Sequence, residues 1–209
     1  MRTPVLSDSK RQTRLPSSER RRLIVETAIR LFAEKGFRGV TTRQLAAEIG
    51  VSEPVLYMHF ETKRDLYSAI IEELAAHPAG ELATREPIPR DDDHAYFLRL
   101  AGDLMQWHTG DPARPRILLF SALEGHELSQ LFHNNHIKLF FDTLAAHIAS
   151  RIEAGVFRPT DPMAAALAFC GMIGQYAQGI VIYKRPDDLA TQRKTIQNMV
   201  DLFLNGLLK

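Results

Sequence analysis

The chain has 209 residues, of which 45% are apolar and 24% are charged, with a single cysteine. These values are ordinary for a globular protein and provide enough apolar side chains for a sizeable core. They exclude an intrachain disulfide, because Cys170 has no second cysteine to pair with. We expect no membrane-spanning helix, and the polar, basic first residues lack the apolar core of a signal peptide, so we expect a cytoplasmic protein.

The net charge of +1 hides a strong asymmetry along the chain. Residues 1–64 hold 13 Lys and Arg against 7 Asp and Glu, whereas residues 65–209 hold 13 against 18. The first part therefore carries +6 and the remainder carries −5. A basic end of this kind is typical of a surface that meets an anion such as nucleic acid.

Residues 1–17 mix Pro, Ser, Thr and scattered basic side chains without an apolar period, which predicts a flexible basic arm. In such an arm Arg2, Lys10, Arg11 and Arg14 could reach the phosphates or the minor groove of DNA. A solvated tail without any DNA contact is the alternative interpretation.

Two helices are predicted after the arm. The apolar spacing over 17–35 predicts a helix of about five turns, which a serine at its start caps and Gly36 ends. Thr41 and Gln44 then form a capping-box pattern. This pattern predicts a very short second helix that stops at Gly50.

A third and a fourth helix follow closely. Ser52 is placed to cap the third helix, with Leu56 and Phe60 expected in the core. Thr62 and Asp65 form a second capping-box-like pattern, which predicts a fourth helix that links this unit to the rest. Two short helices joined by a Gly-containing turn, behind a longer helix and inside the basic part of the chain, are typical of a helix-turn-helix.

At this point the sequence resembles the TetR family of bacterial transcriptional regulators. The matching stretches are Phe32 to Phe37, Val40 to Ala46, Gly50 to Ser52, and Leu56 to Phe60, followed by Lys63 and Leu66. The resemblance is specific for the DNA-binding domain. The rest of the chain resembles the family only in length and helical pattern, which carries no ligand identity.

The resemblance implies a DNA-binding surface on the second and third helices. The implied DNA-binding residues are Thr42, Arg43, Gln44, Ser52, Glu53, Val55, Tyr57, His59 and Lys63. Arg43 or Gln44 could reach a base edge, and Lys63 would hold a phosphate. Tyr57 is expected at a phosphate, with a ring half-buried beside Lys63 as the alternative. Since the third helix has few hydrogen-bond donors, part of the specificity is expected from a thymine methyl against Val55 and from DNA shape.

The remaining chain predicts a loop over 78–93 and then five more helices. These helices are expected over about 94–109, 113–124, 126–154 and 162–183, and in a last segment that follows Asp187. Because no strand alternation of useful length occurs, we expect an all-α fold of about nine helices. Its domains would be the arm over 1–17, a three-helix helix-turn-helix domain over 18–64, and a ligand-binding and dimerisation domain over 65–209.

The segment 162–183 is apolar almost all round and should be covered on several faces. The resembling family dimerises through its last two helices, which implies a homodimer. The implied interface residues are Leu167, Ile173, Gly174, Ala177, Val181, Ile196, Met199, Phe203 and Leu207. Two recognition helices about 34 Å apart would enter successive major grooves of a palindromic operator. The alternative is that both helices only cap the core of a monomer.

The family also implies an effector pocket among the fifth to eighth helices. The candidates are Phe97, Leu100, Leu104, Trp107, His108, Phe120, Phe132, His136, Phe140, Phe169, Met172, Gln175 and Tyr176. Such an apolar and aromatic set suits a hydrophobic or aromatic small molecule, although aromatic residues at helical spacing are more often plain core packing. We therefore expect a homodimeric repressor that such an effector releases from its operator.

Other classes of function have less support. His133 and His136 could share a metal with His126 or Glu127, but two histidines do not complete a tetrahedral site. No HExxH, Gly-rich phosphate loop or GxSxG motif occurs, so we expect no enzyme, metal or cofactor. Cys170 could sense oxidants, but apolar burial should raise its pKa and make it inert. The alternative function is a DNA-binding adaptor whose acidic domain recognises a protein partner.

Overall fold

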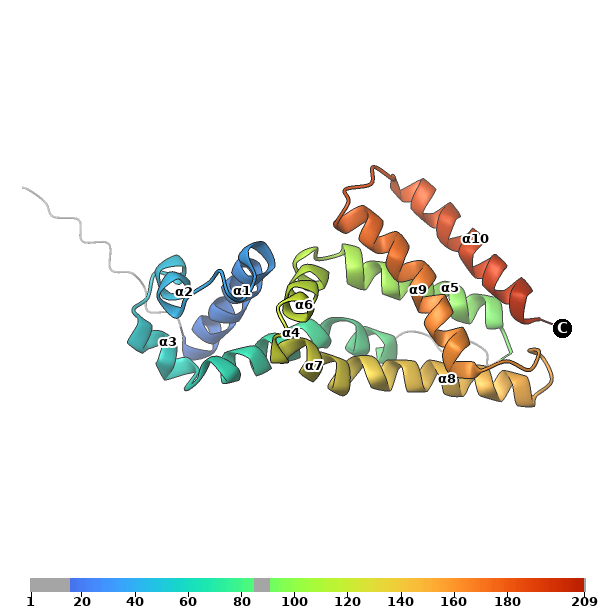
Figure 1. Cartoon of the computed structure of the whole chain (residues 1–209), viewed down its shortest axis with the longest axis horizontal. Helices are drawn as coiled ribbons and strands as arrows, with labels where there is room; N and C mark the ends of the chain where they lie inside the picture. Colours follow the sequence, from blue (N-terminus) through green and yellow to red (C-terminus); the bar gives the residue numbers. More distant parts are fainter. Residues whose placement is uncertain (1–15, 85–90, 209) are drawn as a thin grey trace, which may run out of the picture.

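The computed structural model describes residues 16–84 and 91–208, and the chain in these ranges is built from helices (Figure 1). An isolated bridge between Phe157 and Leu208 is the only β-type pairing in this described part. The all-α prediction is therefore confirmed. Residues 1–15 of the predicted basic arm, with Arg2, Lys10, Arg11 and Arg14, lie outside the described residues, and the predicted last residue of the arm, Ser17, begins the first helix.

Ten α-helices occur in the described ranges. They are α1 Ser17–Lys35, α2 Thr42–Ile49, α3 Glu53–His59, α4 Lys63–Thr84, α5 Asp93–Thr109, α6 Ala113–Leu123, α7 Glu127–Phe132, α8 Lys138–Glu153, α9 Pro162–Val181 and α10 Leu189–Leu207. The predicted single helix over 126–154 corresponds to α7 and α8, which a π-helical turn, His133–Ile137, joins without a break. This turn contains Asn134 and Asn135, whose low helix propensity weakens the regular α-helical ladder there.

The predicted capping boxes are confirmed. The backbone N–H of Gln44 donates to Thr41 Oγ1 at 3.2 Å, and the N–H of Thr41 donates to Gln44 Oε1 at 2.9 Å. Thr62 and Asp65 exchange the same pair of bonds at the start of α4. Because both boxes use residues three positions apart, the local sequence is sufficient to specify them.

Of the two predicted serine caps, the one at the start of α1 is wrong, and the one at α3 is right in position only. α1 begins at Ser17 because the carbonyl of Pro16 already accepts the first helical bond, from Arg20 N at 3.0 Å, so Ser17 lies inside the helix. Ser52 is the N-cap residue of α3, but its side chain makes no capping hydrogen bond. The Ser52 carbonyl takes part instead, accepting from Val55 N at 3.0 Å and from Leu56 N at 3.2 Å.

The predicted loop over 78–93 is also partly wrong, because α4 continues through Pro78 to Thr84. A proline removes one helical hydrogen bond, and most residues from 79 to 84 are good helix formers, which together outweigh that loss. Residues 85–90 lie outside the described ranges. Asp92 then caps α5 by accepting from Ala95 N at 2.9 Å, as the acidic run before that helix predicts.

The apolar side chains form two cores. The first packs α1, α2, α3 and α4 together with α6 and α7, and Leu56 and Phe60 are each 2% exposed within it, as predicted. The second packs α5, α8, α9 and α10 around Phe97 and Phe169. The first core therefore crosses the predicted boundary after residue 64, because α6 packs on α1 and α7 packs on α4.

Among the described helices, α9 alone meets a length and composition test for a candidate membrane span. Its 20 residues are long and apolar enough to pass that test. In the folded chain α9 lies against α5 and α8 (Figure 1), with Phe169, Ile173 and Ala177 fully buried. Burial of one face explains part of the apolar composition, whereas Leu167 on another face keeps 52% of its surface exposed.

Candidate nucleic-acid interface

The turn between α2 and α3 fixes how the third helix leaves the second. Gly50 has φ +77°, a conformation that glycine adopts without steric cost, and Val51 N donates to Ala46 O at 2.9 Å. Leu45 and Leu56 turn the inner faces of the two helices into the first core. The opposite face of α3 points to solvent, as the DNA-contacting face of a recognition helix does.

The predicted DNA-binding residues lie at this end of the molecule. Five of them are exposed, namely Arg43, Gln44, Ser52, Tyr57 and Lys63. Tyr57 has 45% of its surface exposed to solvent. The other members, Thr42, Glu53, Val55 and His59, are half-buried. Met58, which we did not include, is 79% exposed on the same helix.

Three of these side chains already have partners within the protein. Thr42 Oγ1 donates to Glu53 Oε1 at 2.7 Å, so the Glu53 carboxylate faces α2. The carbonyl oxygen of Gln44 is used by its capping box, which leaves only its amide NH₂ group for DNA. Arg43 is then the side chain of α2 best suited to a bidentate contact with a base, a role that stays a prediction.

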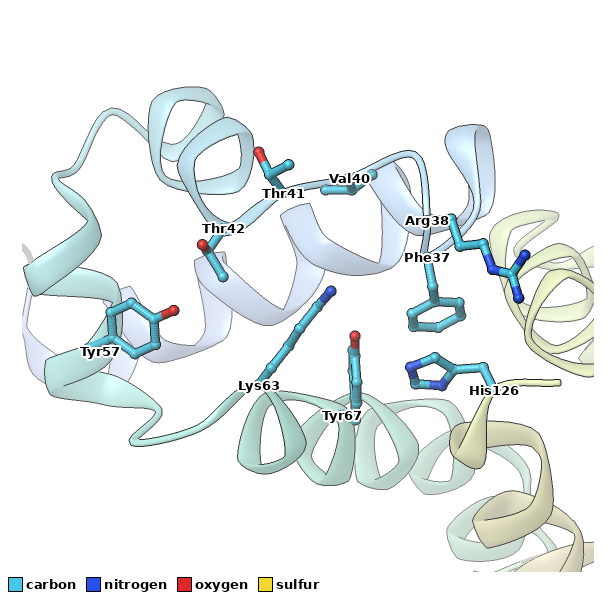
Figure 2. Close-up of a pocket in the computed structure, with 9 residues that line it drawn as sticks. All are labelled: Phe37, Arg38, Val40, Thr41, Thr42, Tyr57, Lys63, Tyr67 and His126. Atoms are coloured by element: carbon cyan, nitrogen blue, oxygen red, sulfur yellow. The ribbon is translucent and has the colours of Figure 1, made fainter. Parts of the chain in front are cut away.

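A pocket of about 560 Å³ lies beside α3. Figure 2 shows its lining residues, which are Phe37, Arg38, Val40, Thr41, Thr42, Tyr57, Lys63, Tyr67 and His126. The Lys63 ammonium and the Tyr67 hydroxyl point into the same space, and Lys63 Nζ lies 5.7 Å from the centroid of the Tyr67 ring. An ammonium group, hydroxyls and the start of α2 are together suited to a phosphate oxygen.

The protonation of Tyr67 supports this chemistry. Burial is the largest cause that raises the pKa of Tyr67, and the negative charges of Glu127 and Glu124 raise it further. The hydroxyl keeps its proton at neutral pH, as a tyrosine with an ordinary pKa of about 10 also does, and it is able to donate a hydrogen bond to an anion.

His126 reaches this pocket from the turn between α6 and α7, which the sequence analysis did not foresee. Its ring stacks on Phe37 with centroids 4.1 Å apart and meets Tyr67 edge-on at 4.5 Å. Its Nδ1 accepts from Leu128 N at 3.2 Å and so caps α7. Burial lowers the pKa of His126, although the nearby Glu127 opposes this change. The neutral imidazole is the form that accepts the capping bond.

The same turn holds the loop between α1 and α2. Glu124 Oε2 accepts the backbone N–H groups of Phe37 at 3.0 Å and of Arg38 at 3.2 Å. Arg116 Nε on α6 also donates to Ala33 O at 3.1 Å. These contacts join the C-terminal part of the chain directly to the helix-turn-helix.

The predicted effector-pocket residues are divided between the two cores. Phe132 belongs to the first core, whereas Phe97, Phe169 and Tyr176 belong to the second, and Gln175 is exposed. The half-buried members are Leu100, Leu104, Trp107, His108, Phe120, His136, Phe140 and Met172. The Nδ1 atom of His108 is buried without a hydrogen-bond partner, and burial lowers the pKa of this imidazole. The effector role of this set stays a prediction.

Several predicted interface residues pack the chain's own second core. Ile173, Ala177, Ile196, Phe203 and Leu207 are at most 9% exposed within one chain, because they form the inner faces of α9 and α10. Gly174, Val181 and Met199 are half-buried and Leu167 is exposed. The outward faces of the two helices also carry Ala168 and Leu202, which the sequence analysis did not name.

The alternative chemistry proposed for the histidines and the cysteine finds no structural support. Among the described residues, no group of three or more His, Cys, Asp or Glu side chains could hold a metal ion. His136 instead lies beside the Phe132 ring, with centroids 5.3 Å apart. Burial raises the pKa of the Cys170 thiol to about 12, as expected, so the thiolate needed for oxidation is scarce at neutral pH.

An outward recognition helix on a Gly-containing turn, next to a pocket with phosphate-binding chemistry, defines a helix-turn-helix DNA-binding protein. The family model described as "Bacterial regulatory proteins, tetR family" matches residues 24–70. A second model, "AefR-like transcriptional repressor, C-terminal domain", matches residues 114–206. The chain belongs to the TetR family of bacterial transcriptional regulators.

Individual relatives agree with this family. The tetracycline repressor protein class C of Escherichia coli is 38% identical over 73 residues, which are 35% of this chain and only 31% of that protein. The nucleoid occlusion factor SlmA of Escherichia coli is 28% identical over 183 residues, which cover 82% of this chain and 89% of that protein. The solved structure of AibR with isovaleryl coenzyme A and operator DNA has a TM-score of 0.68 at 22% identity, covering 88% and 97% of the two chains. This last similarity concerns the fold.

Proposed function

We propose that the protein is a homodimeric, cytoplasmic repressor that binds a palindromic operator and leaves it when a hydrophobic or aromatic small molecule binds. The observation that carries this proposal is the surface formed by Arg43, the outward face of α3 and the pocket around Lys63. Arg43 would read a base edge, while Tyr57 and Lys63 hold phosphates and fix the register of α3 in the major groove.

A dimer is supported by the outward faces of the last two helices. Leu167 and Leu202 are 52% and 68% exposed, and Ala168 is also exposed on α9. A second copy packed on this surface would remove these apolar groups from water, which favours association. It would also present two copies of α3, and two tethered half-site contacts bind a palindrome more tightly than one.

Release by an effector needs a physical connection between the two parts of the chain. The Glu124 and His126 contacts with the loop between α1 and α2 supply such a connection. The similarity in fold to AibR, solved with both isovaleryl coenzyme A and operator DNA, supports control by a small molecule. A coupling of about 1–3 kcal/mol would weaken operator binding by roughly 5- to 150-fold.

Fluorescence anisotropy tests this function. Duplexes that tile the region upstream of the protein's own gene are compared with scrambled DNA at two salt concentrations. We expect tight binding to one palindromic tile, lost in Arg43→Ala and Tyr57→Ala but retained in Arg193→Ala, which removes an exposed charge from α10. Equal and steeply salt-dependent binding to every tile would contradict sequence-specific repression from this region.

A second candidate is a DNA-binding adaptor that a protein partner controls. The observation that favours it is the similarity to SlmA, a nucleoid occlusion factor, along most of the chain. Thermal unfolding in the presence of a library of hydrophobic and aromatic compounds separates the two. A repressor of the proposed kind is stabilised by one compound that also weakens operator binding, whereas an adaptor is stabilised by none.

A further inference from the structure

The recognition helix α3 is too short to hold its own direction. It has seven residues, and Leu56 is its only buried member. Isolated helices of this length are unstable in water, because the first turn costs more conformational entropy than its hydrogen bonds return. The orientation of α3 must therefore come from contacts with neighbouring elements.

Its N-terminal end is held by α2. The hydroxyl of Thr42 donates to Glu53 Oε1 at 2.7 Å, and Glu53 is the first residue of α3. A carboxylate in the first turn is also favoured by the positive end of the helix.

Its C-terminal end is held by α1. Arg21 Nη1 donates to the carbonyl oxygen of His59, the last residue of α3, at 2.7 Å. The Arg21 guanidinium also lies over the ring of Phe60, the C-cap residue, with its central carbon 4.1 Å from the centroid. The last carbonyls of a helix lack helical partners and carry partial negative charge, so a cation at this place is stabilising.

We propose that Arg21 is a positioning residue for sequence recognition, which fixes the direction of α3 in the groove and does not itself bind DNA. This inference rests on the proposed function, in which α3 reads the operator. Both contacts need a planar guanidinium, because the same group must stack on Phe60 and direct an N–H at the His59 carbonyl. A lysine would keep the charge and lose this geometry.

The neighbouring Arg22 is a matched control. It belongs to the same basic run, and its side chain is 72% exposed and pairs only loosely with Glu26, at 3.6 Å. Arg21 and Arg22 therefore contribute the same charge to the same end of α1. Only Arg21 touches the recognition helix among the contacts seen for these two residues.

The test begins with a duplex that the wild-type protein selects from a random pool, together with a scrambled duplex. Anisotropy is then measured between about 50 and 200 mM salt for wild type, Arg21→Lys, Arg21→Ala and Arg22→Lys, at a temperature where circular dichroism shows every variant folded. We expect both Arg21 variants to weaken binding to the selected duplex about tenfold, the loss expected for one hydrogen bond to a charged group. Binding to scrambled DNA and the salt slope should not change, and Arg22→Lys should behave as wild type.

Three results would overturn the inference. If Arg21→Lys binds the selected duplex as well as wild type while Arg21→Ala lowers the salt slope by about 1, Arg21 is a phosphate contact. If folded Arg21→Lys binds the selected duplex and the scrambled duplex more weakly by the same factor, Arg21 contributes to binding without regard to DNA sequence. If the wild-type protein selects no sequence from the pool, the proposed function fails together with the inference. If it selects a sequence but the Arg21 variants do not behave as expected, only the inference fails.

Discussion

The Glu124 carboxylate accepts the backbone N–H of Phe37 at 3.0 Å, across 87 positions of sequence. The same oxygen accepts the N–H of Arg38 at 3.2 Å, so one side chain satisfies two donors of the loop between α1 and α2. Glu124 is the C-cap residue of α6 and thus belongs to the C-terminal part of the chain. This side chain is therefore a direct polar connection between the C-terminal part of the chain and the helix-turn-helix.

We expect Glu124→Ala to lower the free energy of unfolding by about 1–3 kcal/mol, because the partly buried N–H of Phe37 and the exposed N–H of Arg38 lose their acceptor. Glu124→Gln keeps a neutral acceptor oxygen and should cost less. Urea denaturation monitored by circular dichroism measures both changes. Equal stability of Glu124→Ala and wild type would show that water replaces the carboxylate without loss.

Gly36 and Gly50 provide a matched pair of glycine substitutions. Both have positive φ, +69° and +77°, where alanine is strained by about 1–2 kcal/mol. A Cβ at Gly36 would also collide with Glu124 Oε1, whereas one at Gly50 would meet nothing within 4 Å. We expect Gly36→Ala to destabilise the protein more than Gly50→Ala in thermal unfolding, and Glu124→Ala to remove that excess. Equal costs at the two glycines would argue against the close approach of Glu124.

Stability should fall as the pH drops below the ordinary histidine pKa of about 6.5. Burial is the largest cause that lowers the pKa of His108, His126 and His147. The unfolded chain therefore binds protons below about pH 6.5 while the folded chain does not, so stability is full above that pH and declines beneath it. Urea midpoints between pH 7.5 and 5.5 measure the decline, and His126→Gln should make it shallower. A flat profile would contradict the burial of these imidazoles.

A partly buried ion pair between α5 and α8 should matter more than a similar surface pair. Arg151 donates to Asp93 Oδ2 from Nε at 3.1 Å and from Nη2 at 2.8 Å, with side-chain exposures of 16% and 10%. We expect Arg151→Met to cost about 3 kcal/mol, because the carboxylate at the start of α5 loses its partner. Lys138→Met, which removes an exposed pair with Asp142, should cost about 0.5 kcal/mol. Similar midpoints for both variants in urea would contradict this ranking.

Local sequence signals predicted the parts of the fold that depend on neighbouring residues. The capping boxes at Thr41 and Thr62 and the turn at Gly50 need only residues a few positions apart, and all three form as expected. The contact between Glu124 and Phe37 joins residues 87 positions apart, and the contact between Arg21 and His59 joins residues 38 apart. Residue spacing along the chain does not predict such pairs. They come together only when α1 packs on α4 and α6.

The inner and outer faces of α9 could not be separated by sequence for a related reason. The helix is apolar almost all round, so periodicity offers no contrast between Ile173, which is buried, and Leu167, which is 52% exposed. The π-helical turn at His133 leaves no periodic signal either. Both features become visible only when the neighbouring helices are in place.

Repression of the proposed kind requires that α3 reads a particular DNA sequence. The most direct measurement compares the dissociation constants of the wild-type protein for its selected duplex and for a scrambled duplex of equal length, at one physiological salt concentration. We expect the selected duplex to bind at least about 10³-fold more tightly, as specific regulators do. Equal affinities for the two duplexes would contradict the claim and leave only charge-driven binding to the phosphate backbone.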